Sequence, residues 1–227
     1  MKRKIHLLFL LSCAALFSTS CTKNDDVGSY FHEGASYSKS TGLDAESKWL
    51  YDARDNELYP VVEFGGKYWM AENLRYEAEG AMLNADNPSK EYGCLYDWSL
   101  AKTACPAGWH LSSDADWKDL EKALGMADTD LSMLGGRTLA NISDLKAETG
   151  WNNGNNGSNT TLFSMLPAGR YAVGVFENIE DYAFFWTSTQ DTENESIGRY
   201  VFHSRDQVTR THVDHSIAQS CRCVLDY

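Results

Sequence analysis

All seven tryptophans of this 227-residue chain lie at or after Trp49, and this asymmetry limits where a hydrophobic core can form. Residues 22–48 are rich in serine, aspartate, glycine and lysine and contain few aliphatic side chains. Such a segment cannot bury enough apolar surface to fold alone, so we expect residues 21–48 to form a flexible tether. Residues 49–227 contain neither a second linker nor a long internal repeat. They are predicted to form one domain of about 180 residues, which is long enough for a proper core.

The N-terminus has the form of a secretory signal. Three basic residues precede an apolar run over residues 5–17, which at about a dozen residues is too short to span a bilayer. The small residues before Cys21 resemble a lipobox, so we predict a signal peptide at residues 1–20 and lipidation of Cys21. Cys13 fits the lipobox consensus better, but cleavage there would leave an apolar run of only about eight residues.

The residues that follow Cys21 and the net charge predict where the protein acts. Residues 22–26 resemble the lysine- and acid-rich export signal of Bacteroidota surface lipoproteins. We therefore expect an outer membrane lipoprotein that is exposed at the cell surface and held to the membrane only by its lipid. Loss of three basic residues with the leader takes the net charge from −12 to −15. Phosphate backbones and anionic bilayers bind basic surfaces, so we expect no nucleic-acid partner and no electrostatic docking on lipid.

The hydrophobic pattern after Trp49 predicts short helices and antiparallel strands. Two β-prone runs, residues 59–64 and 67–70, flank a two-glycine loop and predict a hairpin. Residues 97–104 and 113–124 read as short helices, the second opened by a capping box and ended by Gly125. The predicted fold class is α+β, a compact mixed domain. Later strands are expected at residues 170–176, 183–187, 199–204, 207–211 and 219–225.

The second predicted helix carries four acidic residues that could be taken for a cation site. Two of them lie in the first turn, where the helix dipole favours anions, and Asp114 and Lys118 form an i,i+4 pair. We therefore expect no metal ion among Asp114, Asp116, Asp119 and Glu121.

A second candidate for metal binding is the group of His203, His212 and His215, with Asp214 between the last two. Zinc needs three or four ligands, and no clear third ligand accompanies the His212–His215 pair. The chain also has no nucleophile elbow, P-loop or dinucleotide-binding glycine triplet. We therefore predict no catalytic residue, no metal and no cofactor.

Eight short motifs follow one another along the domain and carry a family resemblance. They occupy residues 69–74, 92–98, 105–111, 113–117, 150–152, 163–169, 185–189 and 222–224. The series closely resembles the Fibrobacter succinogenes major paralogous domain, a family of secreted and surface proteins, over about residues 52–227. The run from Trp109 to Trp117 and the late Trp186-Thr-Ser-Thr are also similar to the C-type lectin-like and formylglycine-generating enzyme group. That similarity implies a C-type lectin-like fold with neighbouring termini.

Four cysteines lie outside the leader, and the resemblance implies how two of them pair. The two cysteines of the family match Cys105 and Cys223, which implies a disulfide between them. Cys94 and Cys221 are then extra, and a secreted chain tends to add thiols in pairs, so a Cys94–Cys221 disulfide is favoured too. The competing pairing, Cys94–Cys223 with Cys105–Cys221, stays open.

Function is predicted by elimination and by location. An acidic, disulfide-stapled surface domain suits glycans or other cell-surface proteins as partners, so we expect a non-catalytic binding module. The candidate contact is the loop at residues 149–159, where Trp151 could stack on a sugar while Asn152, Asn153 and Asn155 bridge its hydroxyls. Asparagine and glycine also form turns, so Trp151 could instead pin this loop to the core. The alternatives are a structural subunit of the cell surface and an enzyme related to formylglycine-generating enzymes.

Overall fold

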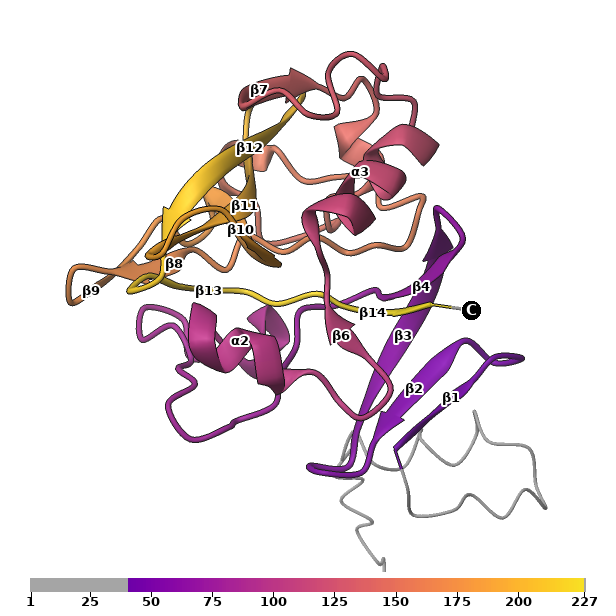
Figure 1. The fold of residues 1–227 in the computed structure, drawn as a ribbon, viewed down its shortest axis with the longest axis vertical. Helices are drawn as coiled ribbons and strands as arrows, with labels where there is room; N and C mark the ends of the chain where they lie inside the picture. The colour runs from indigo at the N-terminus through magenta and orange to yellow at the C-terminus, as the bar shows by residue number, and fades with distance from the viewer. Residues whose placement is uncertain (1–40, 227) are drawn as a thin grey trace, which may run out of the picture. The chain divides into compact units, whose positions relative to one another are not determined.

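Three antiparallel sheets and two short helices make up residues 41–226, the part of the chain that the computed structural model describes (Figure 1). The strands of the largest sheet, in spatial order, are β1 (Gly42–Asp44), β2 (Trp49–Asp52), β3 (Glu57–Phe64), β4 (Lys67–Met70), β14 (Cys223–Asp226) and β6 (His110–Leu111). The described chain begins and ends in this sheet, because β1 is its first strand and β14 pairs with both β4 and β6. The predicted hairpin at 59–64 and 67–70 is confirmed as β3–β4.

Strand β1 lies inside the segment that was expected to be a tether. It pairs with β2 from Gly42, opposite Tyr51, to Asp44, opposite Trp49. Leu43 packs against the core at this edge, and this contact helps to hold the strand in place. The boundary predicted at Trp49 is therefore wrong, because folded structure already begins at Gly42. The signal peptide, Cys21 and the first part of the predicted tether lie outside the described residues.

The two remaining sheets hold four strands each. The second sheet contains, in spatial order, β10 (Tyr182–Gln190), β11 (Glu195–Phe202), β12 (Gln207–Asp214) and β7 (Gly135–Thr138). The third sheet contains, in spatial order, β5 (Tyr96–Asp97), β13 (Ala218–Gln219), β8 (Arg170–Ala172) and β9 (Val175–Glu177). The strands predicted at 183–187, 199–204 and 207–211 correspond to β10, β11 and β12. The single strand predicted at 170–176 is wrong, because Val173 and Gly174 adopt positive φ and turn the chain into the β8–β9 hairpin. The strand predicted at 219–225 is interrupted and becomes β13 and β14.

Both predicted helices are present, with the caps that the sequence indicates. In α2 (Trp98–Ala104) the Asp97 side chain accepts a hydrogen bond from the backbone N–H of Leu100, at 2.8 Å. In α3 (Asp114–Ala123) Ser113 and Asp116 form a capping box, and Gly125 follows the helix end with φ 94°. None of the helices in the described part of the chain is long and apolar enough to cross a membrane.

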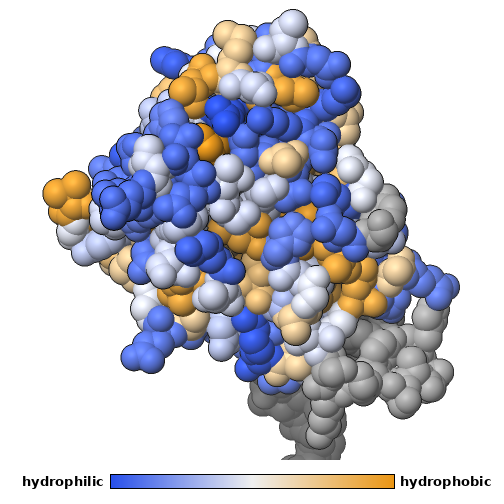
Figure 2. Space-filling model, viewed as in Figure 1, coloured by the Kyte–Doolittle hydropathy of each residue, from blue (hydrophilic) through white to orange (hydrophobic). Residues whose placement is uncertain are grey.

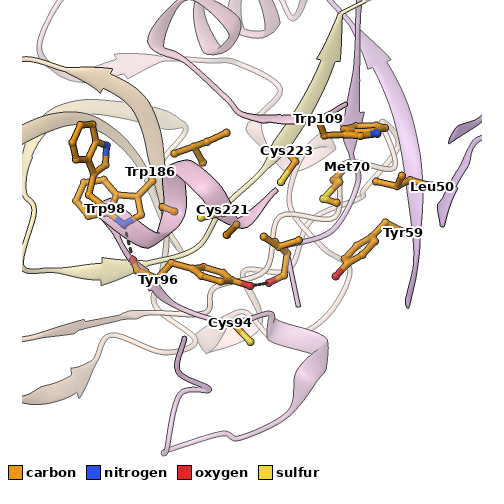
Figure 3. Close-up of a cluster of buried hydrophobic side chains, with 14 of the residues drawn as sticks. Leu50, Tyr59, Met70, Cys94, Tyr96, Trp98, Trp109, Trp186, Cys221 and Cys223 are labelled. Atoms are coloured by element: carbon orange, nitrogen blue, oxygen red, sulfur yellow. Dashed lines mark hydrogen bonds between the residues drawn. The ribbon is translucent and has the colours of Figure 1, made fainter. Parts of the chain in front are cut away.

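Aromatic side chains join the elements into two main core clusters. One contains Trp98 of α2 with Leu50, Tyr59 and Met70 of the six-stranded sheet (Figure 3). In the other cluster, Trp117 of α3 packs edge-on against Trp69 of β4, with ring centroids 5.5 Å apart. The Trp117 ring is also tilted against Phe185 of β10, with a centroid distance of 5.3 Å. Aromatic pairs of this kind are worth about 0.5–1.5 kcal/mol each beyond their buried area. Helix α3 is thereby fixed on the inner face of the sheet formed by β10, β11, β12 and β7.

Candidate functional site

The outer face of the β10–β11–β12–β7 sheet carries the candidate site. Side chains alternate along a strand, so Phe185 of β10 and Val201 of β11 point into the core beside α3. Phe184 and Tyr200 precede them and point to the opposite, outer face, where their ring centroids lie 5.7 Å apart. These two rings form one wall of a pocket with a volume of about 160 Å³. Thr211, Val213, Ile217 and Gln219 line it as well.

A glycine makes room for this pocket. Gly198 is buried two residues before Tyr200 on β11, so any side chain at this position would point to the same outer face. A Cβ atom there would lie 2.6 Å from Cγ2 of Val213 and 3.3 Å from Nε2 of Gln219. The missing side chain therefore leaves the space into which the Gln219 amide extends. Because a cavity of about 150 Å³ can hold benzene, the space is large enough for a ring of that size, and the substituents of a larger ring would extend out of it.

Gln219 is the polar group that distinguishes the pocket. Its backbone is held in β13 opposite Tyr96 of β5, and its side chain is only 1 % exposed. Neither Oε1 nor Nε2 of its amide has a hydrogen-bond partner among the described residues. A buried polar group left in this state costs about 1–3 kcal/mol. Gln219 lines the pocket, and its amide keeps one acceptor and one donor group without a partner; both atoms are themselves buried, so a ligand reaches them only when the surrounding side chains shift. The space is called the Gln219 pocket below.

The charged side chains around the Gln219 pocket already have partners within the protein. Arg170 donates to Glu177 at 2.6 Å, and Asp214 accepts hydrogen bonds from Ser216. Nδ1 of His212 lies 3.2 Å from a carboxylate oxygen of Asp191. The guanidinium of Arg199 binds acids of α3 on the inner face of the sheet. A ligand in the pocket would therefore meet aromatic rings, cationic side chains that are already paired with acids, and the carboxylate of Asp214, which is bonded only to Ser216.

Three of the four acidic residues of α3, namely Asp114, Asp116 and Glu121, form ion pairs, as the helix interpretation favoured for Asp114. Both carboxylate oxygens of Glu121 accept hydrogen bonds from Arg137, each at 2.6 Å, and Oε1 also accepts one from Arg199 at 2.8 Å. Asp114 pairs with Lys118, Arg199 and Arg210. Burial alone would raise the pKa of Asp114, but these cations hold it below its usual range. The network fastens α3 to the sheet.

One group of potential metal ligands does come together in the described residues. His110, Asp116 and Asp226 offer ligand atoms that lie within 4.8 Å of one another. The ammonium group of Lys67 lies between the two acids, at 2.9 Å from Oδ1 of Asp116 and 2.7 Å from Oδ1 of Asp226. These contacts raise the pKa of Lys67, so its positive charge offsets one of the two carboxylate charges. The arrangement is an ion-pair cluster that links β4, α3 and β14.

The three histidines considered as metal ligands have separate partners. His212 lines the Gln219 pocket, while His203 bonds to the Asn155 side chain at 3.0 Å. His215 stacks on Trp98 at 4.0 Å, and its Nε2 lies 2.8 Å from Oγ of Ser196. Sequence reasoning missed this last pair, which has the spacing of a nucleophile and its base. Ser196 is fully buried, however, so its hydroxyl is not presented to a substrate.

The asparagine-rich loop does not present its tryptophan to solvent. Trp151 is 4 % exposed, and its indole N–H donates to the backbone oxygen of Met165 at 3.0 Å. The ammonium group of Lys146 lies 4.3 Å from the centre of the indole ring. The expectation of an outward-facing Trp151 is therefore wrong, because the residue pins the loop to the core.

Two asparagine side chains of this loop, those of Asn152 and Asn155, form hydrogen bonds with neighbouring residues. Asn152 donates to Asp181 at 3.1 Å, and the Asn155 amide bonds to His203. Asn153 is exposed and adopts a positive φ of 54°. The loop is thereby ordered by its own side chains and by its neighbours. A ligand contact at Asn152, Asn153 or Asn155 stays a prediction.

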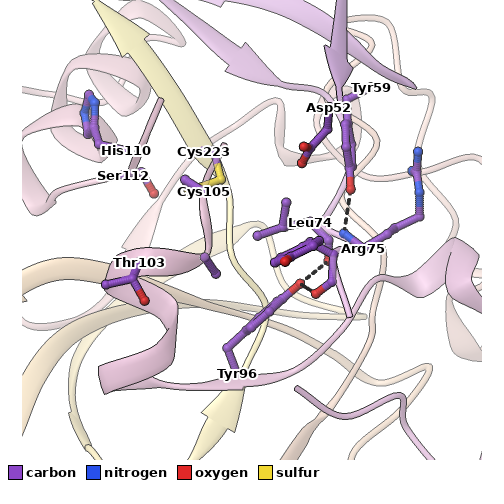
Figure 4. The surroundings of a disulfide bond; sticks show 12 residues. Asp52, Tyr59, Leu74, Arg75, Tyr96, Thr103, Cys105, His110, Ser112 and Cys223 are labelled. Carbon is purple, nitrogen blue, oxygen red and sulfur yellow. Dashed lines mark hydrogen bonds between the residues drawn. A yellow bond between two sulfur atoms is a disulfide. The ribbon is translucent and has the colours of Figure 1, made fainter. Parts of the chain in front are cut away.

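The cysteines bear out half of the predicted pairing. Cys105 and Cys223 form a disulfide, as the family resemblance implies (Figure 4). Cys94 and Cys221 are buried free thiols, so the second predicted disulfide is wrong, and so is the competing pairing.

The reason is backbone geometry around Leu74. The N–H of Cys94 donates to the oxygen of Leu74, and the N–H of Leu74 donates to the oxygen of Cys221. Each of these two hydrogen bonds joins backbone segments that lie about 4.8 Å apart. The Cα atoms of Cys94 and Cys221 are therefore farther apart than the roughly 7 Å that a disulfide allows. The Tyr96 ring also lies between the two residues in Figure 3.

The key residues of the pocket, Gly198 and Gln219, lie outside the eight motifs, so the resemblance did not point to them. A weak signal was present, because Gln219 precedes Cys221 and Cys223 at steps of two residues. Alternation along a strand would place a glutamine there on the same buried face as the cysteines. A buried amide without an obvious partner was therefore foreseeable, although its position beside Gly198 was not.

The structure defines a small, mostly antiparallel α+β domain stapled by one disulfide among its described residues. The family model of the Fibrobacter succinogenes major domain matches residues 62–225, and the chain therefore belongs to this family. Searches of curated proteins and of solved structures each gave no match. The similarity to the C-type lectin-like and formylglycine-generating enzyme group stays a prediction.

Proposed function

We propose that this chain is a non-catalytic binding module of the cell surface, which recognises a glycan or another cell-surface partner through the Gln219 pocket. The observation that carries the proposal is the Gln219 amide, which is buried, has no partner among the described residues and lines a space that fits one ring. A ligand with adjacent donor and acceptor groups would satisfy both ends of this amide at once. Binding pockets typically combine apolar walls with a few such polar groups.

The proposed location depends on residues outside the described part of the chain. A signal peptide at 1–20 and a lipid on Cys21 would hold the domain at the outer membrane, with the acid-rich residues 22–26 directing it to the surface. Labelled fatty acid should enter the wild-type chain but not the Cys21→Ser variant. Label that persists in Cys21→Ser and disappears from Cys13→Ser would move the anchor to Cys13.

A structural or assembly subunit is the second candidate, and the β8–β9 hairpin favours it. Val173 at its tip is fully exposed and Val175 is 56 % exposed. In Figure 2 an apolar group projects from the molecule at this hairpin tip. Two valines are smaller than the apolar patches that usually mark a protein interface, so they favour a limited contact at the hairpin tip. Assembly predicts that the purified chain self-associates and that Val173→Asn reduces this association.

The third candidate, an enzyme, has the Ser196–His215 pair as its strongest feature. Its serine is fully buried, which argues against a nucleophile. Turnover of a substrate, or a metal ion bound in stoichiometric amount, would favour this candidate over the first two.

The test of the binding proposal is a comparison of two glutamine variants. Wild-type protein, Gln219→Met and Gln190→Met should be screened against arrayed glycans and against extracts of surface proteins. Gln190 is the matched control because it is exposed and its amide bonds locally to the oxygen of Thr192. Saturable binding that Gln219→Met removes and Gln190→Met keeps is the expected result. Binding that survives in Gln219→Met would place the site elsewhere.

A further inference from the structure

Four aromatic side chains continue from the Gln219 pocket along the outer face of two strands. Tyr182 and Phe184 come from β10, and Tyr200 and Phe202 come from β11. In the β10–β11 register Tyr182 lies opposite Phe202, and Phe184 lies opposite Tyr200. All four side chains therefore project from the same face of the sheet. They are called the aromatic row below.

The rings of the aromatic row touch one another. Tyr182 stacks on Phe184 with centroids 5.2 Å apart and planes only 9° from parallel. Tyr182 also lies 4.6 Å from Phe202 and 5.8 Å from Tyr200. These mutual contacts limit how far any ring can move. The row is therefore a preformed apolar surface rather than a set of loose side chains.

One end of the aromatic row lies in the Gln219 pocket, and the other end is partly exposed to solvent. Phe184 and Tyr200 line the Gln219 pocket, and Phe184 is 6 % exposed. Tyr182, Tyr200 and Phe202 are partly exposed. In the other direction the outer face is closed, because Trp186 of β10 and Val213 of β12 are buried in the first core cluster. A ligand longer than one ring could therefore extend from the pocket along the row, but not past Trp186 and Val213.

We infer that the site takes a chain of neutral sugar rings, with the terminal ring in the Gln219 pocket and the next rings stacked on the aromatic row. This inference depends on the proposed function. A pyranose has apolar C–H faces and an edge of hydroxyls that both donate and accept hydrogen bonds. The faces match the apolar surface of the row that is left beside the mutual stacking of Tyr182 and Phe184 and the guanidinium of Arg170 over Phe184. Adjacent hydroxyls match the donor and acceptor of the Gln219 amide. A charged sugar fits less well, because the cationic side chains that line the pocket already lie against acids, and the carboxylate of Asp214 would repel an acidic sugar.

The inference predicts that affinity depends on the length of the ligand. Neutral oligosaccharides of glucose, mannose, galactose and xylose should be titrated as monomers, dimers and tetramers by calorimetry. Stacking of one ring on an aromatic side chain, judged from bases in nucleic-acid complexes, is worth about ten-fold or more in affinity. At least one tetramer should therefore bind about ten-fold more tightly than its monomer.

Two variants separate the pocket from the row. Tyr182→Ser should lower the affinity for the tetramer by a larger factor than the affinity for the monomer, because Tyr182 lies on the row and touches the pocket only through Phe184. Tyr51→Ser is the matched control, because Tyr51 is a partly exposed tyrosine of β2 in a different sheet. Gln219→Met should remove the binding of monomer and tetramer alike.

The results distinguish failure of this inference from failure of the proposed function. Equal affinity for monomer and tetramer would overturn the inference, and so would a length dependence that is unchanged in Tyr182→Ser. Binding of a surface protein or peptide through Gln219, with no oligosaccharide bound, would also overturn it while leaving the proposed function intact. If no ligand of any class depends on Gln219, the proposed function fails as well.

Discussion

Val173 combines three features that rarely occur together in one residue. It is β-branched, fully exposed and held at a positive φ of 51° in the turn between β8 and β9. The left-handed conformation costs a residue with a Cβ atom about 1–2 kcal/mol, and asparagine tolerates it better. This residue therefore reduces the stability of the fold, and its side chain is exposed to solvent instead of packing in the core.

Replacement of Val173 by asparagine should stabilise the protein by about 1 kcal/mol, because it relieves the left-handed backbone and removes an exposed apolar group. Urea unfolding of Val173→Asn and wild type measures the difference. Val175→Asn is the control, because Val175 is exposed on the same hairpin but has no positive φ. A less stable Val173→Asn would show that Val173 makes contacts that this account leaves out.

The free thiol of Cys94 makes stability depend on pH. Burial raises the pKa of this thiol from 9.0 to about 11. Between these two values the unfolded chain loses the thiol proton and the folded chain keeps it. The contribution of Cys94 to the free energy of unfolding is thus complete below about pH 9 and is lost as the pH rises towards 11.

Wild type should therefore lose up to about 2 kcal/mol more stability than Cys94→Ala between pH 9 and pH 11. Denaturant unfolding at several pH values measures this slope. Cys221 is present in both proteins, so the part of its titration that burial causes cancels in the comparison, while the part that Cys94 causes does not. Parallel pH profiles would indicate that the Cys94 thiol is exposed to solvent or paired in solution.

At the scale of elements, the family motifs describe the scaffold. Trp69, Trp117 and Trp186 are fully buried, and so is Arg222. Arg222 donates to the Asn73 side chain at 2.9 Å and to the backbone oxygens of Met70 and Phe163. Burial lowers the pKa of Arg222 to about 9. These residues join strands that are distant in sequence, which explains why the motifs predicted the family and the fold better than the site.

The loop at residues 149–159 provides a test at this scale. Trp151→Ala should lower the free energy of unfolding by about 3–5 kcal/mol, as truncation of large buried aromatics does. The expected cause is the loss of its packing and of its hydrogen bond to Met165. Asn153→Gly should have little effect, since Asn153 is exposed and glycine accepts its positive φ. A loss below about 1 kcal/mol for Trp151→Ala would contradict the role of Trp151 as a buried pin.

At the scale of the molecule, local patterns were predictable and long-range placement was not. The caps of α2 and α3 and the β3–β4 hairpin depend on neighbouring residues, and the sequence predicted all three. The two-residue β8–β9 turn was missed, because its first residue is a valine rather than a typical turn former. The Cys94–Cys221 error has a different cause, since the intervening Leu74 comes from another part of the chain. Pockets such as that of Gln219 arise from this kind of long-range contact.

We propose above that Gln219 binds a ligand, and its unpaired amide should then lower the free energy of unfolding of the free protein. If its amide has no partner in the free protein, Gln219→Met should retain the packing and remove a buried polar group. The variant should then be more stable than wild type by about 1–3 kcal/mol. For a chain of this size the melting temperature should rise by about 2–4 °C for each kcal/mol.

The most direct measurement is the thermal unfolding of wild type, Gln219→Met and Gln190→Met without ligand. We expect a higher melting temperature for Gln219→Met and no rise for Gln190→Met, whose amide is exposed and locally bonded. A lower melting temperature for Gln219→Met would contradict the account, because it would show that the Gln219 amide already stabilises the folded protein.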